Sequence, residues 1–367
     1  MMSTVAWWAM AVLPVLMSQI KSDEVVVFYP TCAHLDKGGK TWTVPIHGVI
    51  YEPEQDSLRR SLATASMRRA VGVEGGTPEA ATFERRMRLF LVDNERGKDI
   101  SIRLGSQEYE VGKSGANGHF SAELQLPAAE ADRLLGSRLC PSNWLSFAAL
   151  TPKDDARRFV GRVQLISPSG WSVISDIDDT IKETQVGDRE AMLANTLLRD
   201  FRPVPGMAEL YGQWARQGAA FHYVSGSPWQ LYLLLADFLE KEGFPAGSFH
   251  LKHFRLTDST AFSLLSSQEA TKLGAIEPIL AVFPGRRFVL VGDSGEQDPE
   301  IYGRIARKYG RQIAAILIRN VTDEAADGQR FRRALEGIER QRWELFRRPE
   351  QLEGLLGRLS QSQEAAG

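Results

Sequence analysis

Residues 170–180 of this 367-residue chain read GWSVISDIDDT, in which a short apolar run passes directly into a group of aspartates. The run at 171–175 predicts a short buried strand, because β-branched and aromatic residues are favoured in strands. Asp176 would then lie at the end of that strand, with Asp178 just beyond it. The sequence therefore predicts that a polar site begins where this strand ends.

The sequence that follows this run alternates short apolar segments with amphipathic ones. Strands that alternate with helices imply right-handed crossovers and a parallel sheet with helices on both faces. We therefore expect an α/β fold with a doubly wound parallel sheet. Its predicted strands lie at 171–175, 219–224, 250–254, 287–292 and 313–321, and the strand at 313–321 is expected to be the last one of the sheet. Its predicted helices lie at 205–218, 228–243, about 272–283 and 298–310. Charged helices at 331–346 and 349–359 are expected to close the chain.

The region before residue 170 is rich in predicted strands but irregular. Short β-prone runs lie at 25–29, 42–51, 100–104, 120–126, 144–150 and 159–166, and helical patterns lie at 58–69 and 127–135. We expect a small β-sandwich-like domain with helical insertions. The predicted division is a signal peptide or N-terminal anchor at 1–22, a β-rich accessory domain at 23–169, the α/β domain at 170–325 and a helical tail at 326–367.

The N-terminus carries an apolar run, VAWWAMAVLPVLM, at residues 5–17. It has about the length of a signal-peptide core and is shorter than the ~20 residues of a spanning helix. No Lys or Arg precedes it, and Ser18 and Ser22 are the candidate cleavage positions. We expect an exported or membrane-associated protein, with a cytoplasmic one whose start codon is misassigned as the alternative. Cys32 and Cys140 are two ordinary cysteines or, in an exported chain, one disulfide.

The composition excludes little beyond nucleic-acid binding. The chain is 43% hydrophobic and 25% charged with a net charge of −2. These values are typical of a globular protein of about two domains. No global basic field favours a nucleic-acid partner.

Chemically informative residues follow several of the predicted strands. Asp176 and Asp178 follow the first, Ser225 and Gly226 follow the second, and 292–298 (GDSGEQD) follow a later one. Lys272 begins the helix that leads back into that later strand. In doubly wound sheets, ligands bind at the carboxyl ends of the strands. The sequence therefore predicts that these residues share one edge of the sheet.

Each of these residues also has an ordinary structural explanation. Ser225-Gly226 and the GDSG segment are turn signals when taken alone, and Lys272 alone is a solvated helix residue. The acidic loop could bind calcium, but Thr180 occupies its third ligand position and its glycine is missing. The order of all these residues at one predicted edge favours a shared site over separate coincidences.

The residue types match the hydrolysis of a phosphomonoester. One carboxylate can attack phosphorus and form an aspartyl-phosphate. A second can protonate the leaving alkoxide and then deprotonate water. Two carboxylates repel a phosphate dianion, so a hard cation is needed, and magnesium suits an all-oxygen site. Lys272 with the donors at Ser225 and Gly226 would complete the charge clamp.

The run DIDDT resembles motif I of the haloacid-dehalogenase superfamily, and Ser225, Lys272 and GDSGEQD resemble its motifs II, III and IV. The resemblance implies a haloacid-dehalogenase-like Rossmannoid fold. It makes Asp176 the nucleophile and Asp178 the general acid and base. It places magnesium on Asp176, the backbone carbonyl of Asp178 and Asp293, with Asp298 as an outer support. It implies that Thr180, Ser225, Gly226 and Lys272 bind the phosphoryl group. Lys252 is a weaker candidate for the role of Lys272.

A narrower resemblance covers roughly residues 170–321. The segments GWSVISDIDDTIKET, FRPVPGMAELY, FHYVSGSPWQL and RRFVLVGDSGEQDPEIY are similar to the catalytic domain of the actin-patch-associated phosphatidate phosphatases and their bacterial relatives. This implies magnesium-dependent release of phosphate from phosphatidic acid or a related lipid phosphate. The stretch 182–205 is long enough only for a small flap, so we expect an open site.

Three further sets of residues have less specific interpretations. Pro228, Trp229, Leu231 and Tyr232 would contact lipid or, as we favour, form a buried helix face. The arginines of the tail could meet anionic lipid, but interleaved glutamates favour a solvated helix. His34, His47 and His119 have no metal-ligand spacing and are expected at the surface or in turns.

Three functions remain open at this stage. The first is a phosphatase whose substrate is a phosphorylated lipid or a small soluble phosphoester, with peripheral membrane contact and no nucleic-acid partner. The second is a non-catalytic module that binds phosphatidic acid, which the presence of both Asp176 and Asp178 argues against. The third is a phosphotransferase with an acceptor other than water.

Overall fold

The computed structural model describes residues 18–53, 64–69, 72–136, 143–253 and 268–364. The apolar leader at 5–17, Cys140, Phe254 and the first part of the helix expected at 58–69 lie outside these ranges, and residues 64–69 are helical. Within the described residues, no helix is both long enough and apolar enough to cross a bilayer.

Among the described residues, the second half of the chain forms a six-stranded, entirely parallel sheet in the order β12-β11-β10-β13-β14-β15. The parallel α/β fold expected from the sequence is therefore confirmed. The near-continuous apolar character of these strands fits a sheet buried on both faces. Its strands are β10 (Gly170–Ser175), β11 (Ala220–Pro228), β12 (Ser248–Lys252), β13 (Arg286–Asp293), β14 (Ile313–Arg319) and β15 (Trp343–Phe346).

Helices cover both faces of this sheet. One apolar core lies under α5 (Met207–Arg216), α6 (Tyr232–Lys241) and α10 (Leu355–Glu364), and it contains the buried Trp214 and Leu235. The other lies under α7 (Gln268–Val282), α8 (Asp298–Tyr309) and α9 (Gln329–Ala334). Short 3-10 turns complete the connections: η1 (Trp229–Leu231), η3 (Gly310–Gln312), η4 (Arg340–Arg342) and η5 (Pro349–Leu352).

The strand order has a functional consequence. The chain runs outward from β10 through β11 to β12, and then returns to the other side of β10 with β13. The connections therefore leave in opposite directions at β10 and β13, whose carboxyl ends form the crevice that binds ligands in such sheets. Asp176 follows β10 and Asp293 ends β13, so both lie at this switch point.

The prediction for the end of the chain is partly wrong. A charged helix was expected at 331–346, but helix α9 ends at Ala334 and the segment Trp343–Phe346 is strand β15. This strand pairs in parallel with β14, so β14 is not the last strand of the sheet. Phe346 is fully buried, and burial in the sheet overrides the helical pattern of the surrounding arginines and glutamates.

The first half of the chain forms a second, mainly antiparallel sheet of nine strands among the described residues. The sequence predicts a sandwich, whereas the strands form one continuous ladder. Strand β6 ends the pairing order and β7 pairs with β3 near its other end, yet β6 and β7 contact each other, so the sheet curls around one apolar core. Its strands are β1 (Val25–Phe28), β2 (Thr31–Leu35), β3 (Thr41–Glu52), β4 (Asp93–Asn94), β5 (Asp99–Leu104), β6 (Gln107–Lys113), β7 (His119–Pro127), β8 (Trp144–Ala149) and β9 (Val160–Ile166), with α3 (Ala128–Leu135) beside them.

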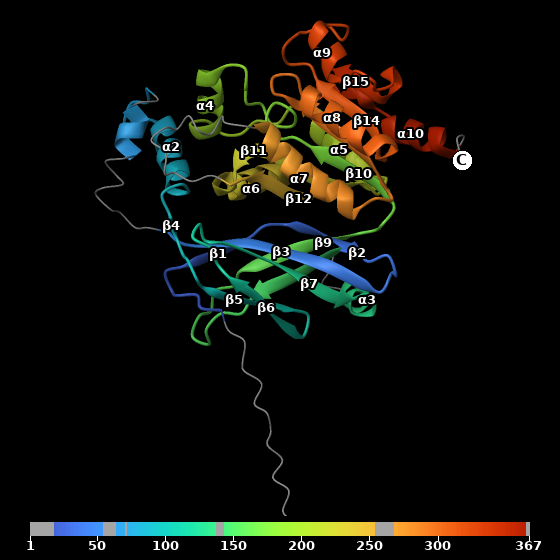
Figure 1. Cartoon of the computed structure of the whole chain (residues 1–367). Helices are drawn as coiled ribbons and strands as arrows, with labels where there is room; N and C mark the ends of the chain where they lie inside the picture. The colour runs from blue at the N-terminus through green and yellow to red at the C-terminus, as the bar shows by residue number, and fades with distance from the viewer. Residues whose placement is uncertain (1–17, 54–63, 70–71, 137–142, 254–267, 365–367) are drawn as a thin grey trace, which may run out of the picture.

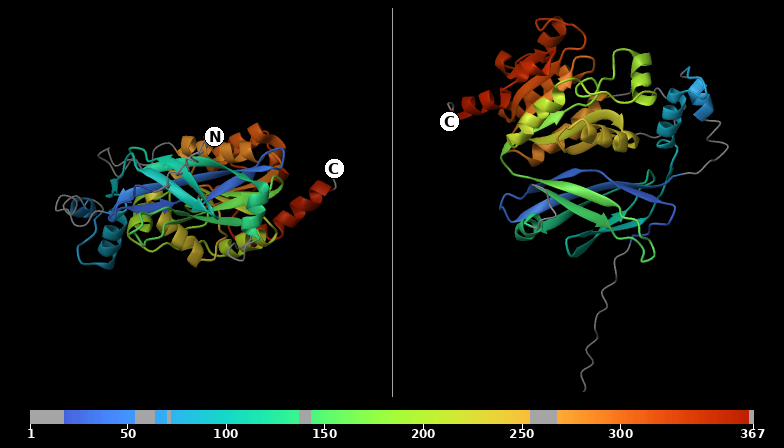
Figure 2. Two further views of the ribbon diagram at one scale, coloured as in Figure 1. Left: turned by 90° about the horizontal axis from the view of Figure 1, so that it is seen from below. Right: turned by 180° about the vertical axis from the view of Figure 1, so that it is seen from behind.

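The two sheets are stacked, as the views in Figures 1 and 2 show. The amide of Phe249 in β12 donates to the carbonyl of Pro30 at 3.2 Å. At the other side of the molecule, α2 (Pro78–Arg88) reaches up to α4 (Arg189–Leu197), so that the β-rich half contacts the flap that follows β10 (Figure 1). Arg86 of α2 is buried and donates to the carbonyl of Thr196 at 2.6 Å.

Candidate active site

Asp176 is the first residue after β10, and its side chain is fully buried. Its amide donates to the carbonyl of Val291 in β13 at 2.9 Å, so the neighbouring strand fixes its backbone. Its Oδ1 lies 3.1 Å from Nζ of Lys272, and the hydroxyl of Thr180 donates to Oδ2 at 3.4 Å. The predicted nucleophile therefore has one oxygen beside a cation, and neighbouring side chains bury it.

Lys272 connects Asp176 to the segment after β13. The lysine is buried, and its Nζ lies 2.8 Å from Oε2 of Glu296 and in contact with Oδ1 of Asp298. Asp298 in turn accepts a hydrogen bond from the amide of Asp293 at 3.2 Å. The sequence-predicted Asp176, Lys272, Asp293 and Asp298 thus lie in one cluster, to which the structure adds Glu296.

Four acidic side chains surround a single lysine in this cluster. Burial raises the pKa of Asp176 and that of Asp293 well above their usual range, and the neighbouring carboxyl groups add to this effect. Burial alone would lower the pKa of Lys272, but Asp176 and the other carboxylates raise it well above its usual value. The cluster therefore brings together more carboxyl groups than its own cation can neutralise if all of them are ionised.

The cluster also fits a bound cation. One carboxylate oxygen from each of Asp176, Asp293, Glu296 and Asp298 lies within 4.8 Å of the others. Oδ2 of Asp293 is buried without a hydrogen bond, and so is Oδ1 of Asp176, which lies 3.1 Å from Nζ of Lys272. Buried charged oxygens are costly unless they are paired or bind a metal. An all-carboxylate donor set favours a hard ion such as Mg²⁺.

Asp178 lies outside this cluster and faces a different set of donors. Its Oδ1 lies 2.7 Å from Nζ of Lys182 and accepts from the hydroxyl of Thr184 at 2.8 Å. Its Oδ2 accepts from Ser225 at 3.0 Å and from Ser227 at 2.9 Å. Burial would raise the pKa of Asp178, but Lys182 and these donors lower it to about 2. The side chain is thus held as a carboxylate.

The predicted phosphoryl-binding residues lie around these two aspartates. Ser225 is buried in β11 and accepts a hydrogen bond from the amide of Ser227 at 2.9 Å, with Gly226 half-buried between them. Thr180 is fully buried beside Asp176. Sequence reasoning missed Ser227, although the repeated serine in SGS at 225–227 was a visible signal.

Asp179 organises the start of the flap and was also missed. Its backbone has a φ of 53°, in the left-handed region that aspartate tolerates better than most residues. Its carboxylate accepts three amide hydrogen bonds, from Thr184, Gln185 and Val186, at 2.6–2.8 Å. Arg319, the last residue of β14, donates to its carbonyl at 2.6 Å. These contacts fold the chain after β10 back toward the ends of the other strands.

The loop after β13 is held from several sides. A Cβ atom on Gly292 would lie 2.2 Å from Oδ2 of Asp298, so only glycine fits there. The hydroxyl of Ser294 accepts from the amides of Val321 and Thr322 at 2.9 and 3.1 Å. Arg330 donates to the carbonyl of Ser294 at 2.5 Å and pairs with Glu300 and Glu324. This arginine of the C-terminal tail therefore contacts protein groups beside the site.

Several alternatives from the sequence are now decided by geometry. Lys272, and not its competitor Lys252 at the end of β12, pairs with Asp176. The predicted burial of the residues after Ser227 is confirmed for Pro228, Trp229, Leu231 and Tyr232. Only Tyr232 lies in helix α6, because Pro228 ends β11 and the other two lie in the turn η1.

Asp176 is buried by the surrounding side chains, and a cavity of about 590 Å³ beside the flap is lined by Asp179 and Arg319. One further expectation is wrong. The three histidines are not surface or turn residues. They lie half-buried in β2, β3 and β7, because each alternates with core residues along its strand.

Comparison with known proteins reaches the same half of the chain. Residues 171–320 match the family described as "Phosphatidate phosphatase APP1, catalytic domain". The Saccharomyces cerevisiae protein named phosphatidate phosphatase APP1 is 37% identical over 166 residues, which are 44% of this chain and 28% of that protein. An uncharacterized Schizosaccharomyces pombe protein is 30% identical over 172 residues, which are 46% of this chain and 28% of that protein.

The chain thus spans less than a third of the length of these curated relatives. Among solved structures, a match to a beta-glucuronidase of Parabacteroides merdae covers 81% of this chain and 34% of the beta-glucuronidase chain. The identity is 10% and the TM-score is 0.26, which is too low to indicate a shared fold.

Proposed function

Because residues 171–320 belong to the phosphatidate phosphatase APP1 catalytic-domain family, we propose that this chain is a magnesium-dependent phosphatase that hydrolyses a phosphomonoester, with phosphatidic acid as its first candidate substrate. The observation that carries the proposal is the convergence of Asp176, Lys272 and Asp293 at the switch point of the parallel sheet. The proposal includes a haloacid-dehalogenase-like fold for this half of the chain.

In the first step, a carboxylate oxygen of Asp176 forms a bond to phosphorus. The bond from phosphorus to the alcohol oxygen breaks, and that oxygen takes a proton from the carboxyl group of Asp178. The products are the free alcohol, diacylglycerol in the case of phosphatidic acid, and an aspartyl-phosphate on Asp176. Lys272, 3.1 Å from Asp176, would neutralise charge on the transferring group.

In the second step, Asp178 as a carboxylate removes a proton from water, whose oxygen attacks phosphorus. The bond to Asp176 breaks, phosphate leaves, and Asp178 holds the proton for the next cycle. The structure supports the base form, because Lys182 and three hydroxyls hold Asp178 ionised with a pKa of about 2. The acid form requires a higher pKa. A phosphate dianion that draws the hydroxyls of Ser225 and Ser227 away from Asp178 would raise it.

Magnesium would be held by carboxylate oxygens of Asp176 and Asp293, with the backbone carbonyl of Asp178 as the expected third ligand and Asp298 as an outer support. Glu296 is a further candidate that only the geometry indicates. When bound, the ion would neutralise the charge that accumulates on the phosphoryl oxygens. The site fits a bound cation, because four carboxyl groups face the single cation of Lys272.

The proposal is tested by measuring phosphate release from phosphatidic acid in detergent micelles, and from soluble phosphoesters, with Mg²⁺ and with EDTA. Release from phosphatidic acid that needs Mg²⁺ and is lost in Asp176→Asn is the expected result. Asp237→Asn, which changes an exposed carboxyl group paired only with Lys241, is the matched control. If the protein hydrolyses only soluble phosphoesters, the assignment of a lipid substrate is wrong. If it binds phosphatidic acid without hydrolysing it, the proposed phosphatase activity is wrong.

A further inference from the structure

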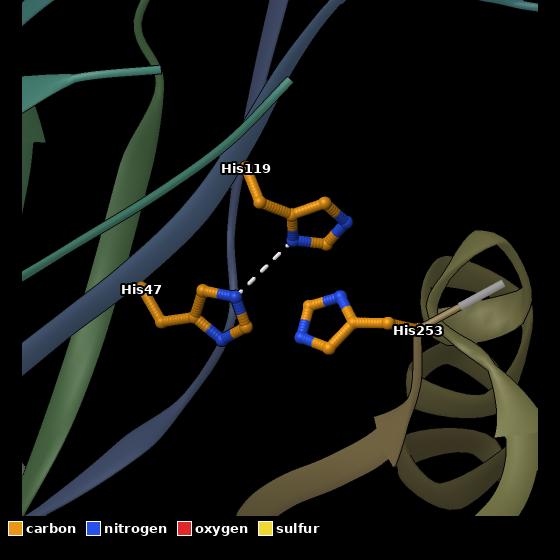
Figure 3. A group of neighbouring side chains, drawn as sticks. All are labelled: His47, His119 and His253. Atoms are coloured by element: carbon orange, nitrogen blue, oxygen red, sulfur yellow. Dashed lines mark hydrogen bonds between the residues drawn. The ribbon is translucent and has the colours of Figure 1, made fainter. Parts of the chain in front are cut away.

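Three histidines from distant parts of the chain converge on the side of the parallel sheet that faces the β-rich half. His47 lies in β3 and His119 begins β7, both in the antiparallel sheet. His253 directly follows β12 of the parallel sheet. Figure 3 shows the three rings turned toward a common point, with His253 coming from the side opposite the other two. The cluster therefore spans the contact between the two sheets.

The distances suit a shared metal ion. Nε2 of His47 lies 3.2 Å from Nδ1 of His119. Two nitrogens bound to one tetrahedral zinc, each at 2.0–2.1 Å, are about 3.3–3.4 Å apart. One nitrogen of each histidine lies within 4.8 Å of the other two, so His253 has only a small distance to close. His253 is exposed and follows the last residue of β12, which leaves its side chain room to move.

The donor set separates this cluster from the acidic one. Among the described residues, no carboxyl or thiol group joins the three imidazoles. Imidazole nitrogen is a ligand for zinc and neighbouring transition metals, whereas magnesium and calcium prefer oxygen.

Aromatic side chains form the walls of the cluster and a cavity gives access to it. The rings of Tyr29 and Trp229 each lie 4.8 Å from that of His47, measured between centroids. His119, Tyr29 and Trp229 also line a cavity of about 370 Å³. A metal held by three histidines would thus keep one coordination position on the open side, as in sites with an exchangeable ligand.

We propose that His47, His119 and His253 bind one Zn²⁺ ion, which ties the β-rich sheet to the parallel sheet. The site is separate from the carboxylates of the active site and takes a different class of metal. The alternative is a hydrogen bond between His47 and His119 with no metal, in which one ring nitrogen carries a proton. A metal needs the lone pairs of both nitrogens, so the two arrangements exclude each other and differ in their dependence on His253.

The test is zinc binding by the full chain, freed of its purification tag and stripped of metal. Mg²⁺ is kept in excess so that it competes for the acidic site, and Zn²⁺ is added against a chromophoric chelator of known affinity. The bound metal is counted per chain. The variants are His253→Gln, which changes an exposed side chain, and His119→Gln. The matched controls are His34→Gln, a half-buried histidine of the same sheet outside the cluster, and Asp293→Asn in the acidic site.

We expect one zinc ion per chain in the wild type, in His34→Gln and in Asp293→Asn. Loss of a ligand should weaken binding by at least the 10–100-fold that removal of an outer partner costs, in both His253→Gln and His119→Gln. Co²⁺ in place of Zn²⁺ should give tetrahedral absorption bands that His253→Gln abolishes. Absence of zinc from the wild type, unchanged affinity in His253→Gln, or loss of zinc in Asp293→Asn would each overturn the proposal.

Discussion

Nζ of Lys182 lies 2.7 Å from Oδ1 of Asp178, and the lysine side chain is buried. The two residues belong to the same turn after β10, and Lys182 also donates to Thr184 at 2.6 Å. This cation keeps the predicted acid and base, Asp178, in its charged form although the side chain is largely buried. Lys182 was not among the residues that the motifs indicated, because its role depends on a fold of the turn that no spacing reveals.

Replacement of this lysine should cost stability. Removal of one partner from a buried ion pair destabilises by about 3–5 kcal/mol, so Lys182→Met should lower the free energy of unfolding by that amount. The measurement is urea unfolding at pH 7 in EDTA. If the ion pair is the cause, the double variant Lys182→Met, Asp178→Asn should lose less free energy of unfolding than the two single variants lose in sum. Losses that add would contradict the coupling of the two side chains.

The same pair sets a dependence on pH. The folded-state pKa of Asp178, about 2, lies below its ordinary value of 3.8. Its contribution to the free energy of unfolding is therefore complete above pH 3.8 and is lost as the pH falls from there toward 2. Lys182→Met removes this contribution, so the stability difference between wild type and variant should narrow as the pH is lowered below about 4. A difference that stays constant would contradict the assignment.

Asp178→Asn should separate the two chemical steps. The loss of a general acid and base typically costs 10²–10⁴-fold in rate. An aryl phosphate has a leaving group that needs no proton, so Asp176 should still be phosphorylated, while the second step lacks its base. Rapid quenching and peptide mass spectrometry should then find a phosphoryl group on Asp176. Recovery of unmodified Asp176 alone would count against the covalent intermediate.

Magnesium should stabilise the fold through Asp293. Burial and the neighbouring carboxylates raise the pKa of Asp293, which means that its charged form destabilises the metal-free protein at neutral pH. Mg²⁺ at about 100 times its dissociation constant should add ~2.7 kcal/mol to the wild type. Asp293→Asn should be at least as stable as wild type in EDTA and gain little from Mg²⁺. Thermal unfolding with and without Mg²⁺ measures both, and an equal gain in the variant would exclude Asp293 as a ligand.

Gly292→Ala should disturb the site although it replaces no charged residue. The added Cβ would lie 2.2 Å from Oδ2 of Asp298, which must move and draw Lys272 with it. A displacement of about 1 Å can cost 10²-fold in activity. Gly187→Ala is the control, since a Cβ there meets nothing within 4 Å. Phosphate release under saturating Mg²⁺ is the measurement, and equal rates for the two variants would contradict the close-packing argument.

The sequence predicted most strands of the parallel sheet but not its edge strand β15. The apolar runs that became β10, β11, β13 and β14 are short, continuous and bounded by turn residues, which is the signal of a doubly buried strand. Strand β15 has four residues in a charged surrounding, so its local pattern favours a helix. Pairing with β14 decided the outcome, and pairing is a tertiary interaction.

The candidate site was predicted where its residues lie at the carboxyl ends of strands. Asp176 directly follows β10, Asp293 ends β13, and Ser225 lies near the carboxyl end of β11. Glu296 escaped the prediction because it lies within a loop, where the side-chain direction depends on how Asp293 and Arg330 fold that loop.

The order of residues along the chain by itself determined the strand ends, and with them the placement of Asp176 and Asp293 at one edge of a parallel sheet, since a switch from apolar to polar residues is a local property. Only the tertiary structure decided that Lys182 neutralises Asp178 and that His47, His119 and His253 meet. The physical reason is that the first contact depends on how a turn closes on itself, and the second on how two separate sheets stack. Neither leaves a period or a spacing in the sequence.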